Sequence, residues 1–594
     1  MQKETIFHQP YDQYAFAIND QAYCLRLRTK KGDCTEVILY YGDPFHFKES
    51  RWNIEEPLPM YRAFSTEMFD FWEVSVIPPN KRMKYQFFIK NDHFSFFYGE
   101  AGFSDQFNDH DLSNSFTLPY LHKNELISPP NWIKKTIWYQ IFPDRFASGN
   151  LLNNPTNTLA WGKSQPTNTS FYGGDIEGII QKIDYLKDIG ISGIYLTPIF
   201  EANSNHKYDT IDYLKIDPSF GDEAILKRLI KKCHDHNIRV MLDAVFNHTS
   251  YSFPPFQDVL ENGKHSKYYH WFHFHPDELN NEHSSYETFS FVKEMPKLNT
   301  ENKDVQNFLL EIGSYWIKEF NIDGWRLDVA NEIDHYFWKL FHRKMKEIKP
   351  DIFIVGEIWH HAMPWLRGDE FDSVMNYPLL KSLLSYFSYE TISTIQFKHS
   401  INEMISQYPI QVIKVLFNII GTHDTPRILT QSHHQDKKVI LLYVFLLTFF
   451  GTPCIYYGDE IGLTGGNDPE CRSCMVWDSS RHNQLIYNSL KKLISLRGLY
   501  PVLENEGEFK WIDPIDEQSQ TLIYERSSDE MSIFVFINPT HEKASVTLPI
   551  KMRNKRITNL WNHSQFAAES DSILIDIPPV DFFILKIEST DSFI

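Results

Sequence analysis

The sequence has few cysteines, no long apolar run and a deficit of basic residues, and each shortage excludes a class of protein. Six cysteines in 594 residues are too few for a disulfide framework, which is typical of a reducing compartment. Cys471 and Cys474 form a lone Cys-x-x-Cys pair; without a second pair to complete a zinc site, we interpret them as loop thiols. The net charge of −19 argues against nucleic acid and anionic membranes as partners, because both attract basic surfaces.

The most apolar segment, VILLYVFLLTFF at 439–450, is too short to cross a bilayer and ends at a Gly-Thr-Pro break. We predict that it is a buried helix. The first residues, MQKETIFHQPYDQYAF, lack the apolar region and cleavage site of a signal peptide. With the cysteine content, this predicts a cytoplasmic protein.

Three regions differ in their pattern, and a chain of this length is expected to fold as several domains. Residues 1–127 alternate apolar and polar positions between turn signals, which predicts an N-terminal antiparallel β-sandwich. Residues 504–594 return to the same pattern and predict a C-terminal β-sandwich.

The central region, 128–503, alternates short β-rich runs with amphipathic helical stretches, which is typical of a (β/α)8 TIM barrel in the α/β class. The connection after the third run is unusually long, and we expect residues of about 247–300 to form an inserted lid subdomain. The eight runs are 136–143, 191–199, 238–246, 322–329, 351–358, 373–378, 415–423 and 453–460.

Polar residues gather at the carboxyl ends of four of these runs, where barrel enzymes place their chemistry. The third run ends in Asp243, Asn247 and His248, the fourth carries Arg326 and Asp328, the fifth ends in Glu357, and the seventh ends in His423 and Asp424. Singly, any of these acids could be a surface ion-pair partner or a helix cap. Together they predict one site.

Clustered carboxylates need either a shared metal or one protonated member beside an ionised one. His248, Asp328, Glu357 and His423 could ligate a divalent ion, but Arg326 next to Asp328 would repel it. Hydrolysis of a glycoside by two carboxylates fits better, with Asp328 as ionised nucleophile and Glu357 as proton donor. A separation of about 5–5.5 Å would predict retention of configuration, and about 6.5–9.5 Å inversion.

Four motifs, DAVFNH, GWRLDVANE, GEIWH and GTHDTPR, resemble in order and spacing the conserved regions of the α-amylase superfamily, glycoside hydrolase family 13. MPKLNT at 295–300, WYQIFPDRF, NHKYDTIDY and GGNDPECRSCMVWD are similar to the neopullulanase, cyclomaltodextrinase and maltogenic amylase group. The resemblance implies that Asp328 is the nucleophile, Glu357 the general acid/base and Asp424 the carboxylate that stabilises the oxocarbenium-like transition state.

The resemblance also implies a set of sugar-binding residues. Arg326 would fix the nucleophile, Tyr208 would stack beneath the reacting glucose, and His248 and His423 would bind its hydroxyls. The non-reducing side of the cleft would be closed by Asp468 and Arg472, and the acceptor side would be formed by Asn331, Glu332 and Trp359. Phe289 is either a stacking residue of the acceptor side or a core aromatic of the lid.

Members of this group often hold calcium after the first strand, and here the matching positions are poor in charge. The corresponding residues are Asn150, Asn153, Asn154 and Asp175, with Ser148 where an amide is usual. Calcium prefers several charged oxygens, so these residues predict a weak structural calcium site. The chemistry itself requires no cofactor.

The implied function is a retaining α-glucan hydrolase that cleaves α-1,4 bonds of cyclomaltodextrins, maltodextrins and pullulan, with some transglycosylation. The N-terminal domain is similar to one that many members use to form a homodimer. Two alternatives stay open: an oligo-1,6-glucosidase or trehalose-forming relative, and a non-catalytic glucan-binding protein on the same barrel. The N-terminal domain and MPKLNT disfavour the first, and the intact set of carboxylates disfavours the second.

Overall fold

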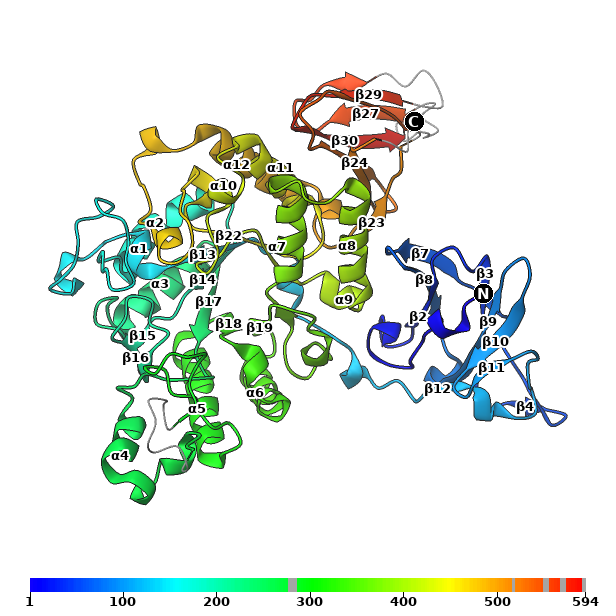
Figure 1. Ribbon diagram of the computed structural model, residues 1–594, viewed down its shortest axis with the longest axis horizontal. Coiled ribbons are helices and arrows are strands. Elements are labelled where there is room, and N and C mark those ends of the chain that lie inside the picture. The colour runs from blue at the N-terminus through cyan, green and yellow to red at the C-terminus, as the bar shows by residue number, and fades with distance from the viewer. Residues whose placement is uncertain (276–285, 515–518, 549–554, 567–572, 590–594) are drawn as a thin grey trace. The chain divides into compact units, whose positions relative to one another are not determined.

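The computed structural model describes residues 1–275, 286–514, 519–548, 555–566 and 573–589 (Figure 1). Two compact units are distinguished within it. One combines Met1–Ser128 with two later segments, His361–Gly368 and Ile395–Ile413. The other comprises Pro129–His360, Asp369–Thr394 and Lys414–Ile594.

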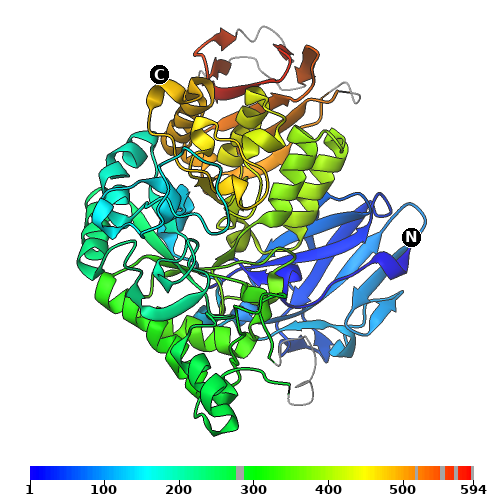
Figure 2. The same ribbon diagram turned by 60° about the vertical axis from the view of Figure 1, so that its left-hand side comes forward.

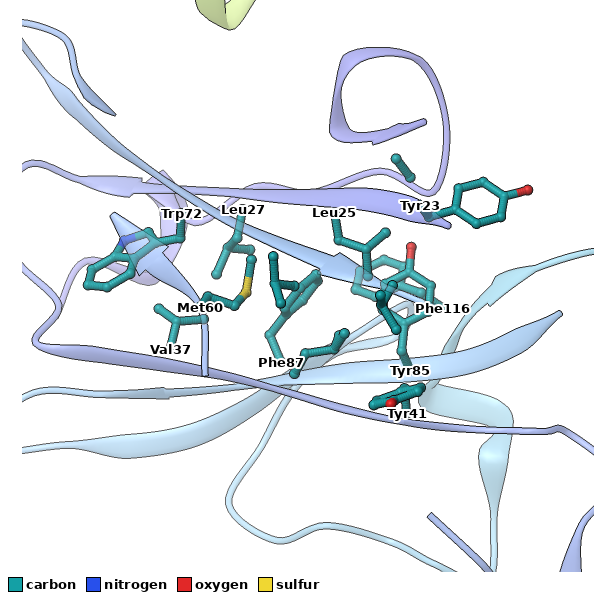
Figure 3. Close-up of a cluster of buried hydrophobic side chains, with 14 of the residues drawn as sticks. Tyr23, Leu25, Leu27, Val37, Tyr41, Met60, Trp72, Tyr85, Phe87 and Phe116 are labelled. Carbon is teal, nitrogen blue, oxygen red and sulfur yellow. The ribbon is translucent and has the colours of Figure 1, made fainter. Parts of the chain in front are cut away.

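The N-terminal part of the first unit is a β-sandwich, as predicted. Apolar side chains that alternate along each strand point between the two sheets, for example Leu25, Leu27, Val37, Tyr85 and Phe87 (Figure 3). One sheet has the order β1 (Ala15–Ala17), β2 (Tyr23–Lys30), β8 (Phe69–Val76), β7 (Tyr61–Ser65). The other has the order β11 (Gly102–Ser104), β10 (Ser95–Gly99), β9 (Met83–Lys90), β3 (Glu36–Gly42), β6 (Leu58–Pro59), and β12 (Phe116–Leu118) pairs with β9.

The second unit contains the predicted eight parallel strands; seven of the eight predicted runs contain one of them, and the eighth, 453–460, overlaps a strand that begins one residue earlier, at Thr452. Their order is β20 (Ser373–Val374), β19 (Phe353–Gly356), β18 (Gly324–Leu327), β17 (Arg239–Ala244), β14 (Gly193–Leu196), β13 (Trp138–Ile141), β22 (Thr452–Tyr456), β21 (Phe417–Ile419). A parallel bridge between Met375 and Phe417 joins the two ends of this sheet into a barrel. Helices cover the outside of the strands (Figures 1 and 2), which explains the nearly continuous apolar runs.

Local sequence signals explain where the helices begin. Asp175, Asp222, Asn302 and Asp334 each accept a backbone N–H of the first turn that follows, and so cap α2, α3, α5 and α6. The helices are α1 (Pro143–Phe146), α2 (Ile176–Ile189), α3 (Glu223–Asp235), α5 (Lys303–Phe320), α6 (His335–Ile348), α7 (Tyr377–Leu383), α8 (Thr394–Ser406), α9 (Ile410–Ile413), α10 (Ile428–Gln431), α11 (Asp436–Thr448) and α12 (Gln484–Leu499).

The apolar segment 439–450 lies mostly in α11, whose residues are buried from Lys438 onward, so the predicted buried helix is confirmed. Among the described residues, no helix is both long and apolar enough to span a membrane.

The segment inserted after β17 folds back on itself. It contains α4 (Pro254–Asn262), and bridges from His248 to Lys297 and from Phe272 to Leu298 join its beginning and its middle to its end. Residues 276–285 of the predicted lid lie outside the described residues. The insertion therefore brings the MPKLNT segment beside the carboxyl end of β17.

The C-terminal strands form a second antiparallel pair of sheets, beside α11 in both views (Figures 1 and 2). One has the order β23 (Glu508–Trp511), β24 (Leu522–Ser527), β25 (Ser532–Asn538), β30 (Asp581–Ser589), β27 (Lys555–Asn559), β28 (Gln565–Phe566), and the other pairs β26 (Ala544–Leu548) with β29 (Ile573–Ile577). Two buried arginines, Arg497 and Arg526, donate to carbonyl oxygens at the carboxyl end of α11. They satisfy acceptors that the helix itself leaves free.

Candidate active site

A cavity of about 550 Å³ opens at the carboxyl ends of the barrel strands, where the four motifs meet. Its lining includes eleven of the residues predicted from the sequence: Tyr208, His248, Phe289, Asp328, Asn331, Glu357, Trp359, His423, Asp424, Asp468 and Arg472. Arg326 lies buried beneath it. Glu332 is not among the lining residues.

Arg326 is the centre of the charged groups. Its Nη1 donates to Asp328 Oδ1 at 2.7 Å and to Asp243 Oδ2 at 2.9 Å. Its Nη2 lies 2.8 Å from Glu357 Oε2. One guanidinium thus contacts three carboxyl groups from three neighbouring strands, because parallel pairing sets Asp243 beside Arg326. A shared metal ion would have to displace this arginine.

The excess of negative charge around Arg326 favours a proton on one of the three carboxyl groups. Three buried carboxylates and one guanidinium would leave two uncompensated negative charges, which a buried site disfavours. Burial accordingly raises the pKa of Asp328 well above its usual value, although Arg326 acts in the opposite direction. Burial likewise raises the pKa of Asp243 to about 6. The cluster therefore holds a proton more readily than separate, exposed carboxylates would.

The backbone between Asp328 and Ala330 is unusual. Val329 has a φ of 45°, a left-handed conformation that is costly for a β-branched residue. In this conformation its N–H donates to Glu357 Oε2 at 3.0 Å. The strain is thus coupled to the orientation of the Glu357 carboxyl group.

Asp424 pairs with a second arginine, Arg472, rather than with Arg326. Arg472 contacts Asp424 Oδ1 through Nη2 at 3.2 Å and Asp468 Oδ1 through Nη1 at 3.1 Å. Burial raises the pKa of Asp424, and the charge of Arg472 opposes this. Asp468 and Arg472, which were predicted on the non-reducing side of the cleft, are therefore connected to Asp424 through ion pairs.

The aromatic and imidazole groups of the site are neutral and ordered by contacts. The rings of Tyr208 and His423 are parallel, with centroids 5.4 Å apart, and Phe289 stacks on His248 at 4.8 Å. Burial lowers the pKa of His248 to about 3 and that of His423 well below its usual value. Both imidazoles can therefore bind hydroxyl groups without adding charge.

On the predicted acceptor side, Trp359 is 51% exposed and stacks on Tyr377 with ring centroids 3.8 Å apart. Its indole Nε1 donates to Glu357 Oε1 at 3.1 Å. Glu332 pairs with Lys297 of MPKLNT at 2.9 Å. An exposed ring beside a carboxyl group is suited to holding a sugar next to the reacting atoms.

Sequence reasoning missed several residues of the site. Asn168, His206, Met295 and Val329 also line the cavity. His206 could have been suspected, because it lies two residues before Tyr208 in the same motif. Nothing in the local sequence singles out Asn168, whose place depends on the folding of the loop after β13.

The calcium candidates lie close together, and most of their oxygens already have hydrogen-bond partners. Both oxygens of Asp175 accept backbone N–H groups, from Gly149 and from Asn150. Asn150 Oδ1 accepts from Leu152 N, and Asn153 Oδ1 accepts from Asn150 Nδ2. Calcium takes six to eight oxygens, and most of these are already engaged. Asn154 Oδ1 alone among the four side chains' oxygens is buried without a partner. Among the described residues no group of three or more His, Cys, Asp or Glu side chains could hold a metal.

Comparison with known proteins identifies related families along most of the chain. The alpha amylase catalytic domain family matches residues 140–531, the alpha amylase N-terminal ig-like domain matches 1–122, and the maltogenic amylase C-terminal domain matches 514–584. A cyclomaltodextrinase of Geobacillus thermopakistaniensis (strain MAS1) is 48% identical over 590 residues, covering 99% of this chain and 100% of the relative. A maltogenic alpha-amylase of Bacillus acidopullulyticus is 47% identical over 587 residues, with 99% and 100% covered.

The solved structure of a cyclomaltodextrinase superposes with a TM-score of 0.94 at 40% identity, covering 99% of this chain and 100% of that one. The expected fold and family resemblance are thus confirmed. The chain belongs to the α-amylase family, glycoside hydrolase family 13, as a hydrolase of the cyclomaltodextrinase, maltogenic amylase and neopullulanase group.

Proposed function

We propose that this protein cleaves α-1,4-glucosidic bonds of cyclomaltodextrins, maltodextrins and pullulan with retention of configuration, and transfers part of the product to sugar acceptors. The observation that carries the proposal is the contact of one guanidinium with both Asp328 and Glu357. Adjacent nitrogens of Arg326 bring the two groups close. This favours the about 5–5.5 Å separation of retaining enzymes over the about 6.5–9.5 Å of inverting ones.

In the first step, Asp328 attacks the anomeric carbon while Glu357 gives its proton to the glycosidic oxygen. Oδ1 of Asp328 is bonded to Arg326, so the attack falls to Oδ2. Glu357 Oε2 accepts from Val329 N and faces Arg326, so we assign the proton to Oε1, which also accepts from Trp359 Nε1. The glycosidic C–O bond breaks, and a glucosyl ester of Asp328 forms.

In the second step, Glu357 takes a proton from water or from a sugar hydroxyl, whose oxygen attacks the same carbon. The ester bond to Asp328 breaks, and the carboxylate returns to Arg326. Attack by water gives hydrolysis, and attack by a sugar gives transglycosylation. Asp424 accepts hydrogen bonds from the reacting sugar and stabilises the positive charge that develops on its ring.

The remaining residues bind the two sides of the scissile bond. Asp468 and Arg472 hold the non-reducing side, while Trp359 and Asn331 hold the acceptor. Phe289, stacked on His248, serves the acceptor side. Glu332, paired with Lys297, lies at the margin of that side.

We further propose a cytoplasmic homodimer that docks through the N-terminal unit. The six cysteines are free, and Phe45, Met68 and Ile77 are large apolar side chains that this unit exposes. Sedimentation across a concentration range tests the dimer, and a purely monomeric chain at micromolar concentration would contradict it.

The function is tested by incubating the protein with γ-cyclodextrin, maltotriose and pullulan and following products and anomers by NMR. Wild type is expected to release α-anomeric products at first. Glu357→Gln and Asp328→Asn should each lose at least about a thousandfold in kcat. Glu370→Gln is the matched control, since Glu370 is a buried glutamate bonded to His335 and absent from the cavity lining.

Three outcomes would contradict the proposal. β-Anomeric products would show inversion. Cleavage confined to α-1,6 bonds would favour an oligo-1,6-glucosidase. Binding of glucans by folded protein without any cleavage would favour a non-catalytic glucan-binding protein.

A further inference from the structure

A buried glutamine lies behind the imidazole of His423. Gln140, on β13, is almost fully buried, and its amide Nε2 is 2.8 Å from His423 Nδ1. Gln140 is not among the residues that line the cavity, whereas His423 is. Its amide group can therefore reach a bound sugar only through the imidazole.

The opposite nitrogen of His423 faces the site. His423 Nε2 lies 2.7 Å from Tyr208 Oη and 3.2 Å from Asp424 Oδ2. Tyr208 Oη in turn lies 3.0 Å from Asp243 Oδ2. A continuous series of hydrogen-bonding atoms thus runs from Gln140 to Asp243.

When Asp243 is ionised, only one direction of hydrogen bonding satisfies every member of the series. If the Gln140 amide donates to Nδ1, the hydrogen of neutral His423 is on Nε2 and faces Tyr208 Oη and Asp424. The single Tyr208 hydroxyl hydrogen is then free to bond Asp243. In the reverse arrangement, His423 carries its hydrogen on Nδ1, and a lone pair of Nε2 faces the Asp424 carboxylate. The single hydroxyl hydrogen of Tyr208 can then bond either Nε2 of His423 or Asp243, and the other acceptor is left without it.

We propose that Gln140 is a positioning residue that holds neutral His423 in the tautomer with its hydrogen on Nε2. This inference rests on the proposed function, in which His423 donates to a hydroxyl of the reacting sugar. A fixed Nε2–H supplies that donor without any rearrangement during the reaction. If the hydrogen moved to Nδ1, Nε2 would present a lone pair to the sugar and could no longer donate.

The charges around His423 keep it neutral. Arg472, whose Nε donates to His423 O, and the nearby Arg326 both disfavour an imidazolium, and Glu357 opposes them. Burial is the largest contribution to the lowered pKa of His423. Asp424, Tyr208, Gln140 and Phe142 also contact the ring. Because the ring is neutral, the single hydrogen it carries decides what it can bind.

The tautomer can be read directly by nitrogen NMR of the full-length wild type labelled in histidine, with His423→Gln to assign the signals. We expect Nδ1 to be the nitrogen without a hydrogen. Finding that Nε2 lacks the hydrogen would overturn the proposal. This measurement needs no substrate, so its result does not depend on the proposed function. Failure of the proposed function would instead appear as a wild-type protein without activity.

Kinetics on maltotriose test the consequence for the reaction. In Gln140→Glu the new carboxylate accepts from Nδ1, so Nε2 keeps a hydrogen only while His423 is protonated. We expect kcat to fall with rising pH through a new titration step that wild type lacks. At pH 8 the loss should be about tenfold or more, with KM changed less than about threefold. Gln140→Met, which fixes neither tautomer, should lose several-fold without a new step.

Two controls separate positioning from a structural role. Gln306→Glu changes another buried glutamine, whose amide donates to Thr300 O away from the cavity, and should add no titration step. In a His423→Gln background, Gln140→Glu should have almost no further effect on kcat. Additive losses in that double variant, or a pH profile of Gln140→Glu parallel to wild type, would overturn the proposal.

Discussion

At the scale of single residues, the active site is organised by one arginine rather than by its acids. Arg326 contacts Asp243, Asp328 and Glu357, and the acids acquire their orientation from this arrangement. Arginine suits the position because its planar fork reaches several carboxylates at once, whereas lysine acts as a point charge.

Arg326→Lys is therefore expected to reduce kcat/KM on maltotriose by at least about a hundredfold although the charge is kept. Steady-state kinetics measure this loss. Arg239→Lys is the control, because Arg239 on the same barrel pairs with Asp323 away from the cavity lining. An Arg326→Lys variant within threefold of wild type would show that charge alone suffices.

The sequence predicted most of these residues because their motifs stand at strand ends, where a barrel collects them. It did not predict Gln140 or Tyr195. Tyr195 donates to Asp243 at 2.6 Å from a neighbouring strand, and such a contact depends on barrel closure and register. Local patterns carry no signal for a side chain that acts through another one.

At the scale of elements, the hydrophobic patterns of the sequence predicted the strands and the buried helix, but not the contacts at the junctions between elements. Arg526 of β24 donates to the carbonyl oxygens of Thr448, Leu503 and Glu504. Burial lowers its pKa to about 9, yet its backbone acceptors keep it in place. A sequence shows an arginine in a β-strand but not which carbonyl groups it will satisfy.

Arg526→Met should destabilise the second unit by about 3 kcal/mol or more, because several buried carbonyl groups would lose their donor. Thermal unfolding and limited proteolysis of the C-terminal region measure this. Arg556→Met, on exposed surface of β27, is the control and should shift stability by less than about 0.5 kcal/mol. Equal behaviour of the two variants would contradict the role given to Arg526.

At the scale of the whole molecule, each unit carries its own sensitivity to conditions. His8 is buried in the sandwich, where Nδ1 donates to Arg26 O and Nε2 accepts from Tyr85. Burial lowers its pKa to about 3. The predicted sandwiches and barrel were confirmed, but the inclusion of residues 395–413 in the first unit has no local signal in the sequence.

Acidification should loosen the first unit through His8. The unfolded chain binds a proton near pH 6.5 and the folded one only near 3, so stability is complete above about pH 7.5 and falls as the pH drops. At pH 5 this one group costs about 2 kcal/mol. Hydrogen exchange of β9, corrected for intrinsic pH dependence, should show less acid sensitivity in His8→Gln than in wild type. Identical pH responses would contradict the assignment.

Calcium should have little influence on the folded molecule, because most of the candidate oxygens are already hydrogen-bonded. Millimolar calcium or a chelator should shift the Tm by less than about 1 °C. The double variant Asn150→Asp/Asn154→Asp adds two carboxylates at the same loop and is expected to make the Tm calcium-dependent. A strong calcium response of wild type would show that the loop rearranges around the ion.

The composition of the first unit has a consequence during synthesis on the ribosome. The sandwich leaves the ribosome early, but α8 and α9, which pack in the same unit, are made only after most of the barrel. Until then Arg26 Nη1 lacks the hydrogen bond that it donates to Ser406 O, at 2.9 Å, in the folded chain. At about 5–20 residues per second this interval is on the order of 15–60 s. A nascent chain would meanwhile present a finished domain with an uncovered polar face, open to chaperones and to neighbouring chains on the same messenger RNA.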